Sequence, residues 1–494
     1  MLGLSRKNNS PLRDRLDTAA RSAKSLAWAG WVQGLCVILF AGLMLSIILI
    51  PFKLIFWACI CLSAFILCHT LLRAAACLSS TQIFTHHNAV DSADETANNS
   101  MLWPAYTVLI PLKDEAHMLP FIISAMSKLD YPRDRLQILL ITEESDPATT
   151  QAANAFAEPP FYTVVVPRGG PKTKPNALNH AMNIATGTLV TIYDAEDHPH
   201  PQQLKTAARA MAANPQWGAL QAPLDYFNGS ETKLARQFTI EYAALFHVWV
   251  PFLARLSLPF PLGGTSNHMR RQALTETGGW DAYNVTEDAD LSFRLSALGW
   301  DIGYISLPTL EEAVTHWKPW RNQRTRWMKG YIQTWMVHMQ IPLAPGGMRG
   351  LARCFTLQVT LGASLLSGLC HALVIAGIIG VGIQSLRTGQ SLQFIWPILI
   401  TTGLNYSVNI AIGALGLYRA GKSQLLWSVP FMPFYWLVLI IPSWIAVIDL
   451  FTDPYNWRKT THGVTHMRPT TQSEVSIEQN TASSPLVITP SHLN

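Results

Sequence analysis

Two long apolar stretches stand near the start of the chain. Residues 26–50 and about 54–78 each exceed the roughly 20 apolar residues that a helix needs to cross a bilayer. Only a short turn with Pro51 and Lys53 separates them. We therefore expect a transmembrane helical hairpin over 26–79. It follows a basic cytoplasmic N-terminus, residues 1–25, whose lysines and arginines favour the inner side of the membrane.

Three more apolar segments lie near the other end, at about 353–383, 393–416 and 425–451. They predict a second membrane region over 341–451. Prolines at 430, 433 and 442 are expected to break the last segment into a re-entrant or interfacial piece, so the number of crossings stays open. The polar tail, residues 452–494, is rich in Ser and Thr and is predicted to be disordered.

Between the apolar regions, residues 80–340 have the mixture of polar and apolar positions that is typical of a soluble domain. Short apolar runs predict strands, and the segments between them have helical spacing. Strands alternating with helices imply a mostly parallel sheet covered on both faces. The expected strands are 106–111, 137–142, 163–167 and 188–197, and the expected helices are 116–128 and 175–186.

Composition narrows the class of protein. Hydrophobic residues make up 49% and charged residues 14% of the chain, against about 25% charged in an ordinary soluble protein. This excludes a wholly soluble enzyme. A net charge of +5 without a long basic run argues against a nucleic-acid partner. The seven cysteines all fall in or beside apolar segments and suggest neither disulfides nor a metal knuckle.

Acidic residues follow three of the expected strands, namely Asp114 and Glu115, Glu143 and Glu144, and the run 194–197. Ligands bind beyond the carboxyl ends of parallel strands, so these clusters predict one site. In the run Asp-Ala-Glu-Asp, the carboxylates of Asp194 and Glu196 are expected to hold Mg²⁺ or Mn²⁺ beside a diphosphate. The nearby His198 and His200 make zinc a weaker alternative.

Two later segments each allow two interpretations. In TEDADLSFRL, residues 286–295, the acidic residues either complement the dipole of a helix N-terminus or supply a general base. In RNQRTRWMKG, residues 321–330, the basic side chains either grip lipid headgroups or hold a diphosphate, with Trp327 as a stacking platform for a sugar.

The motifs DAED, TED and QRTRW, in this order and between membrane segments, resemble those of the processive family 2 glycosyltransferases, the group of cellulose, chitin and hyaluronan synthases. The resemblance runs from about Tyr106 to Gly330. It implies a multi-pass α-helical protein of the bacterial inner membrane with a cytoplasmic α/β domain of the GT-A type. It also implies inverting transfer of a hexose from a nucleotide-diphosphate sugar, such as UDP-glucose, to a β-linked polysaccharide, with export of the product.

The same resemblance assigns roles to individual residues. Asp288 would be the general base, while Gln323, Arg326 and Trp327 would hold the diphosphate and the acceptor end. Asp194 and Glu196 would hold the metal. The nucleotide sugar would be bound by Glu115, Glu143, Glu144, Lys174, Asn179 and Asp194. The segment 263–271 would lie near the acceptor, and the aromatic residues Trp396, Trp427, Tyr435, Trp436 and Trp444 would line a path for the polymer.

Two departures from the family pattern stand out. Glu143 and Glu144 replace the usual aspartate pair, and the metal motif is Asp-Ala-Glu in place of Asp-x-Asp. Both are typical of a bacterial branch that also resembles part of a phage-adsorption inner-membrane protein. Three alternatives therefore remain: a transferase that adds one sugar to a lipid carrier, a catalytically silent envelope component, and a lipid-binding scaffold. The sugar, the linkage and any accessory export subunits are not determined by the sequence.

Overall fold

The computed structural model describes residues 22–26, 60–61, 63–79, 102–340, 347–389 and 396–455. The first helix of the expected N-terminal hairpin, residues 26–50, lies almost entirely outside this part of the chain, as do residues 456–494. The second helix of the hairpin is described over Ser63–Ser79. The division of the chain into five segments stays a prediction.

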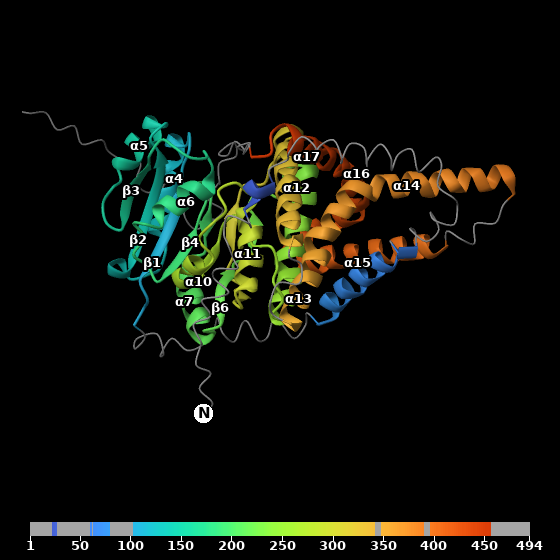
Figure 1. Ribbon diagram of the computed structural model, residues 1–494, viewed down its shortest axis with the longest axis horizontal. Coiled ribbons are helices and arrows are strands. Elements are labelled where there is room, and N and C mark those ends of the chain that lie inside the picture. The colour runs from blue at the N-terminus through green and yellow to red at the C-terminus, as the bar shows by residue number, and fades with distance from the viewer. Residues whose placement is uncertain are drawn as a thin grey trace, which may run out of the picture.

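An α/β domain occupies one end of the molecule, and membrane-type helices occupy the other (Figure 1). The strands of the domain are β1 (Tyr106–Pro111), β2 (Leu136–Glu143), β3 (Phe161–Val166), β4 (Leu189–Ile192), β5 (His198–Pro199), β6 (Trp217–Gln221), β7 (Leu224–Tyr226), β8 (Asn267–Arg270), β9 (Asp301–Tyr304) and β10 (Thr309–Glu311). Its helices are α4 (Leu119–Ser127), α5 (Pro147–Asn154), α6 (Lys174–Ala181), α7 (Gln203–Ala213), α8 (Lys233–Ala244), α9 (Val250–Arg255), α10 (Arg271–Glu276), α11 (Glu287–Ala297) and α12 (Trp317–Met339).

Seven strands form the main sheet, in the order β3-β2-β1-β4-β8-β6-β9. Strands β1 to β4 pair in parallel, as the alternation of strands and helices predicts. Strand β8 runs antiparallel to both of its neighbours, β4 and β6. A smaller sheet, β5-β10-β7, lies beside the main one and brings the end of β10 next to the turn after β4.

Successive residues of β1 point to opposite faces of the sheet, as a strand period of two requires. Val108 and Ile110 belong to a core formed with α4 and α7, whereas Leu109 belongs to a core formed with α6, α8 and α11. Both faces are therefore covered, which explains why the strand is apolar along its whole length. The expected strand 188–197 ends at Ile192, because the run 194–197 closes into a turn.

The remaining helices are apolar and extend from the domain in Figure 1, where α14 and α15 project farthest. They are α13 (Met348–Leu357), a π-helical segment Gln358–Gly362, α14 (Ala363–Thr388), α15 (Trp396–Arg419), α16 (Met432–Val438) and α17 (Ile440–Thr452). Three continuous helical stretches are long and apolar enough to cross a membrane, at Met348–His371, Trp396–Arg419 and Ser423–Thr452. All three overlap the apolar segments expected from the sequence.

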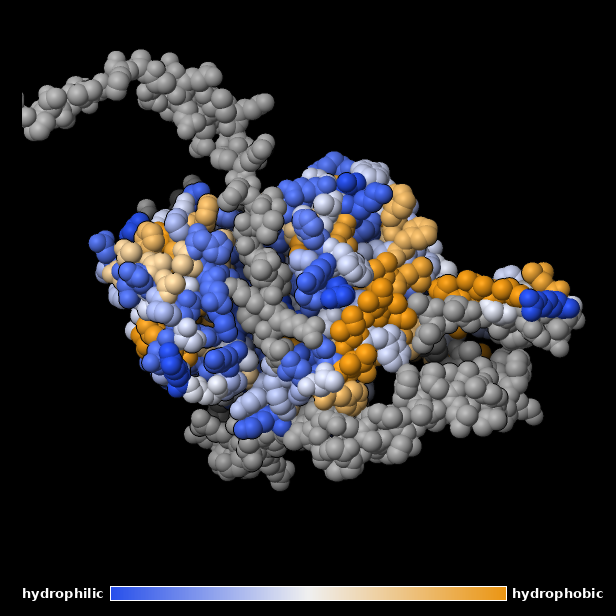
Figure 2. Space-filling model, turned by 90° about the horizontal axis from the view of Figure 1, so that it is seen from above, coloured by the Kyte–Doolittle hydropathy of each residue, from blue (hydrophilic) through white to orange (hydrophobic). Residues whose placement is uncertain are grey.

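The surface view separates the same two parts. Hydrophobic residues cover the side that carries these helices, while hydrophilic residues dominate the α/β domain (Figure 2). The last apolar stretch is divided at its prolines into a 3-10 helix, Ser423–Phe431, followed by α16 and α17. Helix α12 lies between the two parts and packs against α17 and α11, so the domain and the membrane-type helices share one interface.

Candidate active site

One cavity of about 540 Å³ lies where the carboxyl ends of the parallel strands meet α11 and α12. It continues between the membrane-type helices, where residues of α14, α15 and Ser63–Ser79 line it. Most of the predicted site residues line this single cavity, although they come from six separate elements or turns. They are Glu115, Glu143, Lys174, Asp194, Glu196, Asp288, Gln323, Arg326 and Trp327.

At one end of the cavity, Glu115 and Glu143 follow β1 and end β2. Glu115 is buried and accepts a hydrogen bond from the backbone N–H of Lys113 at 3.3 Å. Glu143 lies 3.7 Å from the Lys113 ammonium. Two predicted residues lie elsewhere. Glu144 is exposed and accepts from the backbone N–H of Arg168 at 2.9 Å, outside the cavity lining.

Asn179 also lies outside the cavity lining. Its amide nitrogen donates to the carbonyl of Trp280 at 2.7 Å, and its amide oxygen accepts from the backbone N–H of the same residue at 2.9 Å. The side chain fits against Gly279, whose φ of +82° suits glycine and where a Cβ would come within 2.4 Å of the Asn179 oxygen. Asn179 thus fixes the loop before TED.

The turn after β4 presents Asp194 and Glu196 to the cavity. Its geometry depends on Asp197, which is 2% exposed and accepts from the backbone N–H of Asp194 at 2.6 Å. Thr265 donates a second hydrogen bond to the same oxygen of Asp197. Burial, and next the charge of Asp194, raise the pKa of Asp197 well above its usual value. Asp197 therefore shapes the turn, while the other two carboxylates face the cavity.

Lys174, at the start of α6, crosses to this turn. Its ammonium donates to Asp194 at 2.5 Å and to the carbonyl of Gly264 at 2.8 Å. Burial alone would lower the pKa of Lys174, but the carboxylates of Asp194 and Glu287 outweigh it and leave that pKa above the usual value. The lysine stays charged and holds positive charge at the centre of an acidic site.

The donor atoms here suit a hard divalent cation. Asp194 and Glu196 face the cavity beside Asp197, one oxygen of which is buried without a hydrogen-bond partner among the described residues. In the described part of the chain no three His, Cys, Asp or Glu residues are already grouped around one point. Carboxylates of this kind fit Mg²⁺ or Mn²⁺ that shares its coordination with substrate phosphates, the usual arrangement for Mg²⁺.

The TED segment begins α11, where the acidic residues Glu287, Asp288 and Asp290 have different surroundings. Asp288 lines the cavity, and its Oδ2 is so near Gly264 that a Cβ there would lie 3.3 Å from it. Burial raises the pKa of Asp288, and burial together with the Asp288 charge raises that of Glu287 to about 7. Asp290 instead pairs with Arg294 within α11 at 2.7 Å and with His338 of α12 at 3.0 Å, and the second contact connects the two helices.

Helix α12 carries Gln323, Arg326 and Trp327 on the face toward the cavity. The Trp327 ring stacks on Tyr242, with centroids 6.3 Å apart and planes at 25°. The family resemblance assigned a role to Arg326 but none to the neighbouring Arg324. Arg324 also lines the cavity, forms two hydrogen bonds with Glu241, and lies 4.8 Å from the Trp327 centroid.

Two functional candidates were therefore not predicted from the sequence, Arg324 with its partner Glu241, and Glu311. Glu241 lies 83 residues before Arg324, so no local sequence pattern links the two residues. Glu311 ends a three-residue strand, and burial with the neighbouring carboxylates of Asp197, Glu196 and Asp194 raises its pKa well above the usual value. The only sequence signal for Glu311 was its place in a pair of glutamates, with Glu312, after a short apolar run.

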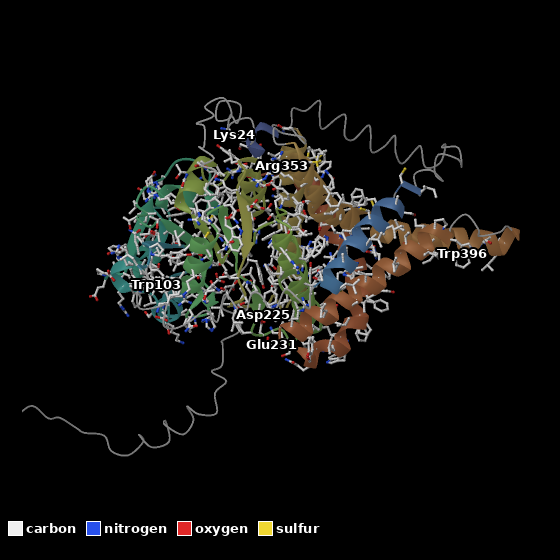
Figure 3. The ribbon with its side chains drawn as sticks, turned by 90° about the horizontal axis from the view of Figure 1, so that it is seen from below. Lys24, Trp103, Asp225, Glu231, Arg353 and Trp396 are labelled. Carbon is white, nitrogen blue, oxygen red and sulfur yellow. The ribbon has the colours of Figure 1, made fainter. Side chains whose placement is uncertain are left out.

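Only part of the expected acceptor segment, and only some of the aromatic residues expected along the polymer path, line the cavity. Gly263, Gly264 and Thr265 line it, whereas the rest of 263–271 forms β8 and starts α10. Tyr435 and Trp436 also line it. Trp396, at the far end of α15 (Figure 3), and Trp427 are more than half exposed, and Trp444 donates to the Leu369 carbonyl.

Comparison with known proteins agrees with this geometry. A model of the glycosyltransferase-like family 2 matches residues 104–330. The "Probable glycosyltransferase YdaM" of Bacillus subtilis is 30% identical over 237 residues, which cover 46% of this chain and 55% of that protein. The "Beta-monoglucosyldiacylglycerol synthase" of Synechocystis is 27% identical over 241 residues, which cover 47% of this chain and 49% of that protein.

A "Probable glucomannan 4-beta-mannosyltransferase" of Oryza sativa is 26% identical over 259 residues, covering 49% of this chain and 43% of that protein. The chain thus spans about half the length of the curated relatives it matches. A solved mannosyltransferase of Pyrobaculum calidifontis, in complex with GDP-Man and Mn²⁺, aligns over 78% of this chain and 99% of its own, with 17% identity and a TM-score of 0.47. Similarity at that level says nothing about the ligands of this chain. The family match and the sequence relatives thus agree that residues 104–330 are similar to the glycosyltransferase-like family 2.

Proposed function

We propose that this chain is a membrane-embedded inverting transferase that polymerises a hexose from a nucleotide-diphosphate donor, such as UDP-glucose, into a β-linked glycan and exports it. The observation that carries the proposal is the continuity of one cavity. It joins the acidic turn after β4 to Asp288 and Trp327, and then continues between helices apolar enough to span a membrane. A donor at one end and a growing chain at the other would share this space.

In this proposal Asp288 takes the proton from the acceptor hydroxyl as its oxygen attacks the anomeric carbon of the donor. The Asp288 carboxylate accepts a hydrogen bond from the backbone N–H of Ala289 at 2.7 Å, which holds it at the start of α11. Its raised pKa makes it a stronger base than an ordinary aspartate. Asp288 also faces the cavity, whereas Asp290 is held by its ion pairs.

Lys174 and Arg326 line the same cavity as Asp288, and the positive charge of both lowers the pKa that burial alone would give it. They would stabilise the diphosphate as it leaves, since preorganised charge usually lowers the barrier of such reactions more than any other effect. A divalent cation held by Asp194 and Glu196 would add Lewis-acid stabilisation of the same phosphates. Trp327, fixed against Tyr242, would stack on the acceptor sugar and hold it in line.

A second candidate, transfer of a single hexose to a lipid acceptor, is favoured by a specific observation. One of the relatives is named as a synthase of β-monoglucosyldiacylglycerol. The membrane part of the cavity also carries apolar side chains from α14 and from Ser63–Ser79, such as Phe65 and Val374. Size and solubility of the product distinguish the two candidates.

The test uses the full chain in lipid nanodiscs with a panel of radiolabelled nucleotide sugars and Mg²⁺ or Mn²⁺. High-molecular-weight product from one donor, reduced about 10²- to 10⁴-fold in Asp288→Asn, is the expected result. Asp134→Asn is the matched control, since that side chain is 78% exposed and far from the cavity lining. A small lipid-soluble product would establish the second candidate. Full turnover by Asp288→Asn would refute the base assignment, and absence of nucleotide binding would indicate a silent envelope component.

A further inference from the structure

Glu311 is a buried carboxylate that the proposed mechanism leaves without a task. It ends β10 in the small sheet, lines the cavity and is 9% exposed. Its Oε1 atom is buried and has no hydrogen-bond partner among the described residues. Burying a polar group without a partner is costly, so such groups in native proteins normally meet a ligand or an ordered water.

The surroundings of Glu311 locate it between two parts of the site. On one side it interacts electrostatically with the acidic turn, chiefly with Asp197 and Glu196, and also with Lys174. On the other side its charge acts on Tyr226 and Tyr242. The pairing of β10 with β7, which sets Glu311 opposite Tyr226, fixes this position in the backbone.

The aromatic wall of the cavity is formed by Tyr242 and Trp327, whereas Tyr226 is buried and does not line it. The rings of Tyr226 and Tyr242 lie 4.5 Å apart at 37°, and Tyr242 stacks in turn on Trp327. Aromatic rings next to a carboxyl group with a free acceptor oxygen suit a pyranose ring, which has apolar C–H faces and hydroxyl donors around its edge.

We propose that Glu311 accepts hydrogen bonds from hydroxyl groups of the donor hexose and helps to determine which hexose the enzyme takes. This rests on the proposed function. The anomeric carbon must lie within reach of Asp288, and the diphosphate must lie at Lys174 and Asp194. The hexose ring therefore occupies the space between the acidic turn and the aromatic wall, where Glu311 lies.

The test measures binding without turnover. The full chain in nanodiscs, with Mn²⁺, is titrated with UDP, UDP-glucose, UDP-GlcNAc, UDP-galactose, GDP and GDP-mannose in competition with a fluorescent nucleotide. For each donor, the affinity ratio between the nucleotide sugar and its free nucleotide isolates what the hexose contributes. Glu311→Gln keeps the shape of the side chain but replaces one carboxyl oxygen with an amide group that donates hydrogen bonds. The ratio for the preferred donor should then fall about 10- to 100-fold, while the affinity for the free nucleotide stays unchanged.

Glu312→Gln is the matched control, being the same substitution at the next residue, which does not line the cavity. It should keep the wild-type ratio. The inference is overturned if Glu311→Gln keeps that ratio, if it weakens free nucleotide and nucleotide sugar equally, or if the hexose adds no affinity in the wild type. Wild-type protein that binds no nucleotide in the panel would instead overturn the proposed function, and the inference with it. Melting curves of both variants show whether the fold is retained.

Discussion

The side chain of Arg324 offers the sharpest test of how the active-site helix is held. It is 9% exposed, and it donates to Glu241 of α8 through Nη1 at 2.8 Å and through Nη2. Nη2 also donates to the Tyr435 hydroxyl at 2.8 Å. The guanidinium lies 4.4 Å from the Phe238 ring centroid and 4.8 Å from that of Trp327. One side chain thus connects α8, α12 and α16 and packs behind the Trp327 ring.

The magnitude follows from these contacts. Hydrogen bonds to charged groups contribute about 1.5–3 kcal/mol each, and breaking a buried ion pair costs about 3–5 kcal/mol. The Glu241 side chain is 39% exposed, so solvent recovers part of this loss. We expect Arg324→Met to lower the free energy of unfolding by about 3–4 kcal/mol. Arg324→Lys keeps the charge but loses the planar fork, and should cost about 1–2 kcal/mol.

Two measurements follow the change. Thermal unfolding in nanodiscs should show the melting temperature of Arg324→Met lowered by roughly 6–16 °C, at about 2–4 °C per kcal/mol for a domain of this size. Steady-state transfer should show a lower kcat for Arg324→Lys at nearly unchanged nucleotide affinity, because Trp327 loses the planar guanidinium that packs against its ring. Arg321→Lys, three residues earlier on α12 and hydrogen-bonded to neighbouring Asn322, is the matched control.

A double-mutant cycle with Glu241→Gln then isolates the pair. We expect a coupling free energy of about 1–3 kcal/mol. Unchanged melting and unchanged kcat in Arg324→Lys would refute the account of Arg324 as the residue that positions Trp327. A destabilised Arg324→Met with a normal kcat would show that the pair supports the fold and leaves Trp327 in place.

Four further predictions concern the pH dependence of activity, the pH dependence of stability, helix packing and metal. Burial raises the pKa of Asp288, so activity should be lost as pH falls, and the acidic limb of the kcat/KM profile should lie above the range of an ordinary aspartate. An acidic limb near pH 4 would contradict the assignment of Asp288 as the base. Glu287 binds its proton more tightly in the folded than in the unfolded state, since its pKa is about 7 against 4.5. Its contribution to stability should therefore decline as pH rises from about 4.5 to 7 and be level above, and Glu287→Gln should remove that slope in melting temperature. A Cβ on Gly416 would lie 2.5 Å from the backbone of Ala243, so Gly416→Ala should separate α15 from α8. This variant should lose about 1–3 kcal/mol of stability and melt at a lower temperature. Gly403→Ala on the same helix, where the space is open, should melt like the wild type. Equal melting of the two variants would argue against this packing. A chelator should abolish transfer, and Mg²⁺ or Mn²⁺ should restore it; transfer that persists in the chelator would exclude the metal.

The strands of the α/β domain were predictable because their apolar runs are short and end in turn residues. The expected runs at 106–111, 137–142 and 163–167 match β1, β2 and β3 closely. The run at 188–197 was too long, since apolar character continues into the turn that Asp197 closes. The order of the strands was not predictable, because β8, which lies between β4 and β6 in the sheet, comes after both in the chain.

The chemistry-bearing residues were largely predictable from local motifs, but their partners were not. Asp194, Asp288 and Trp327 all line the cavity that the motifs predict. Asn179 has the right residue type, yet it holds Trp280 instead of facing that cavity. A motif determines which groups are available, whereas the direction of a side chain depends on the loop packed against it.

The sequence by itself determined the apolar helices, the strands and the acidic and basic motifs, because each depends on residues close together in the chain. Only the tertiary structure decided which of several similar side chains face the substrate path. It paired Arg324 with Glu241 and brought Glu311 beside an acidic turn more than a hundred residues earlier. Such contacts depend on the pairing of β10 with β7 and on the packing of α12 against α8, and neither leaves a local pattern.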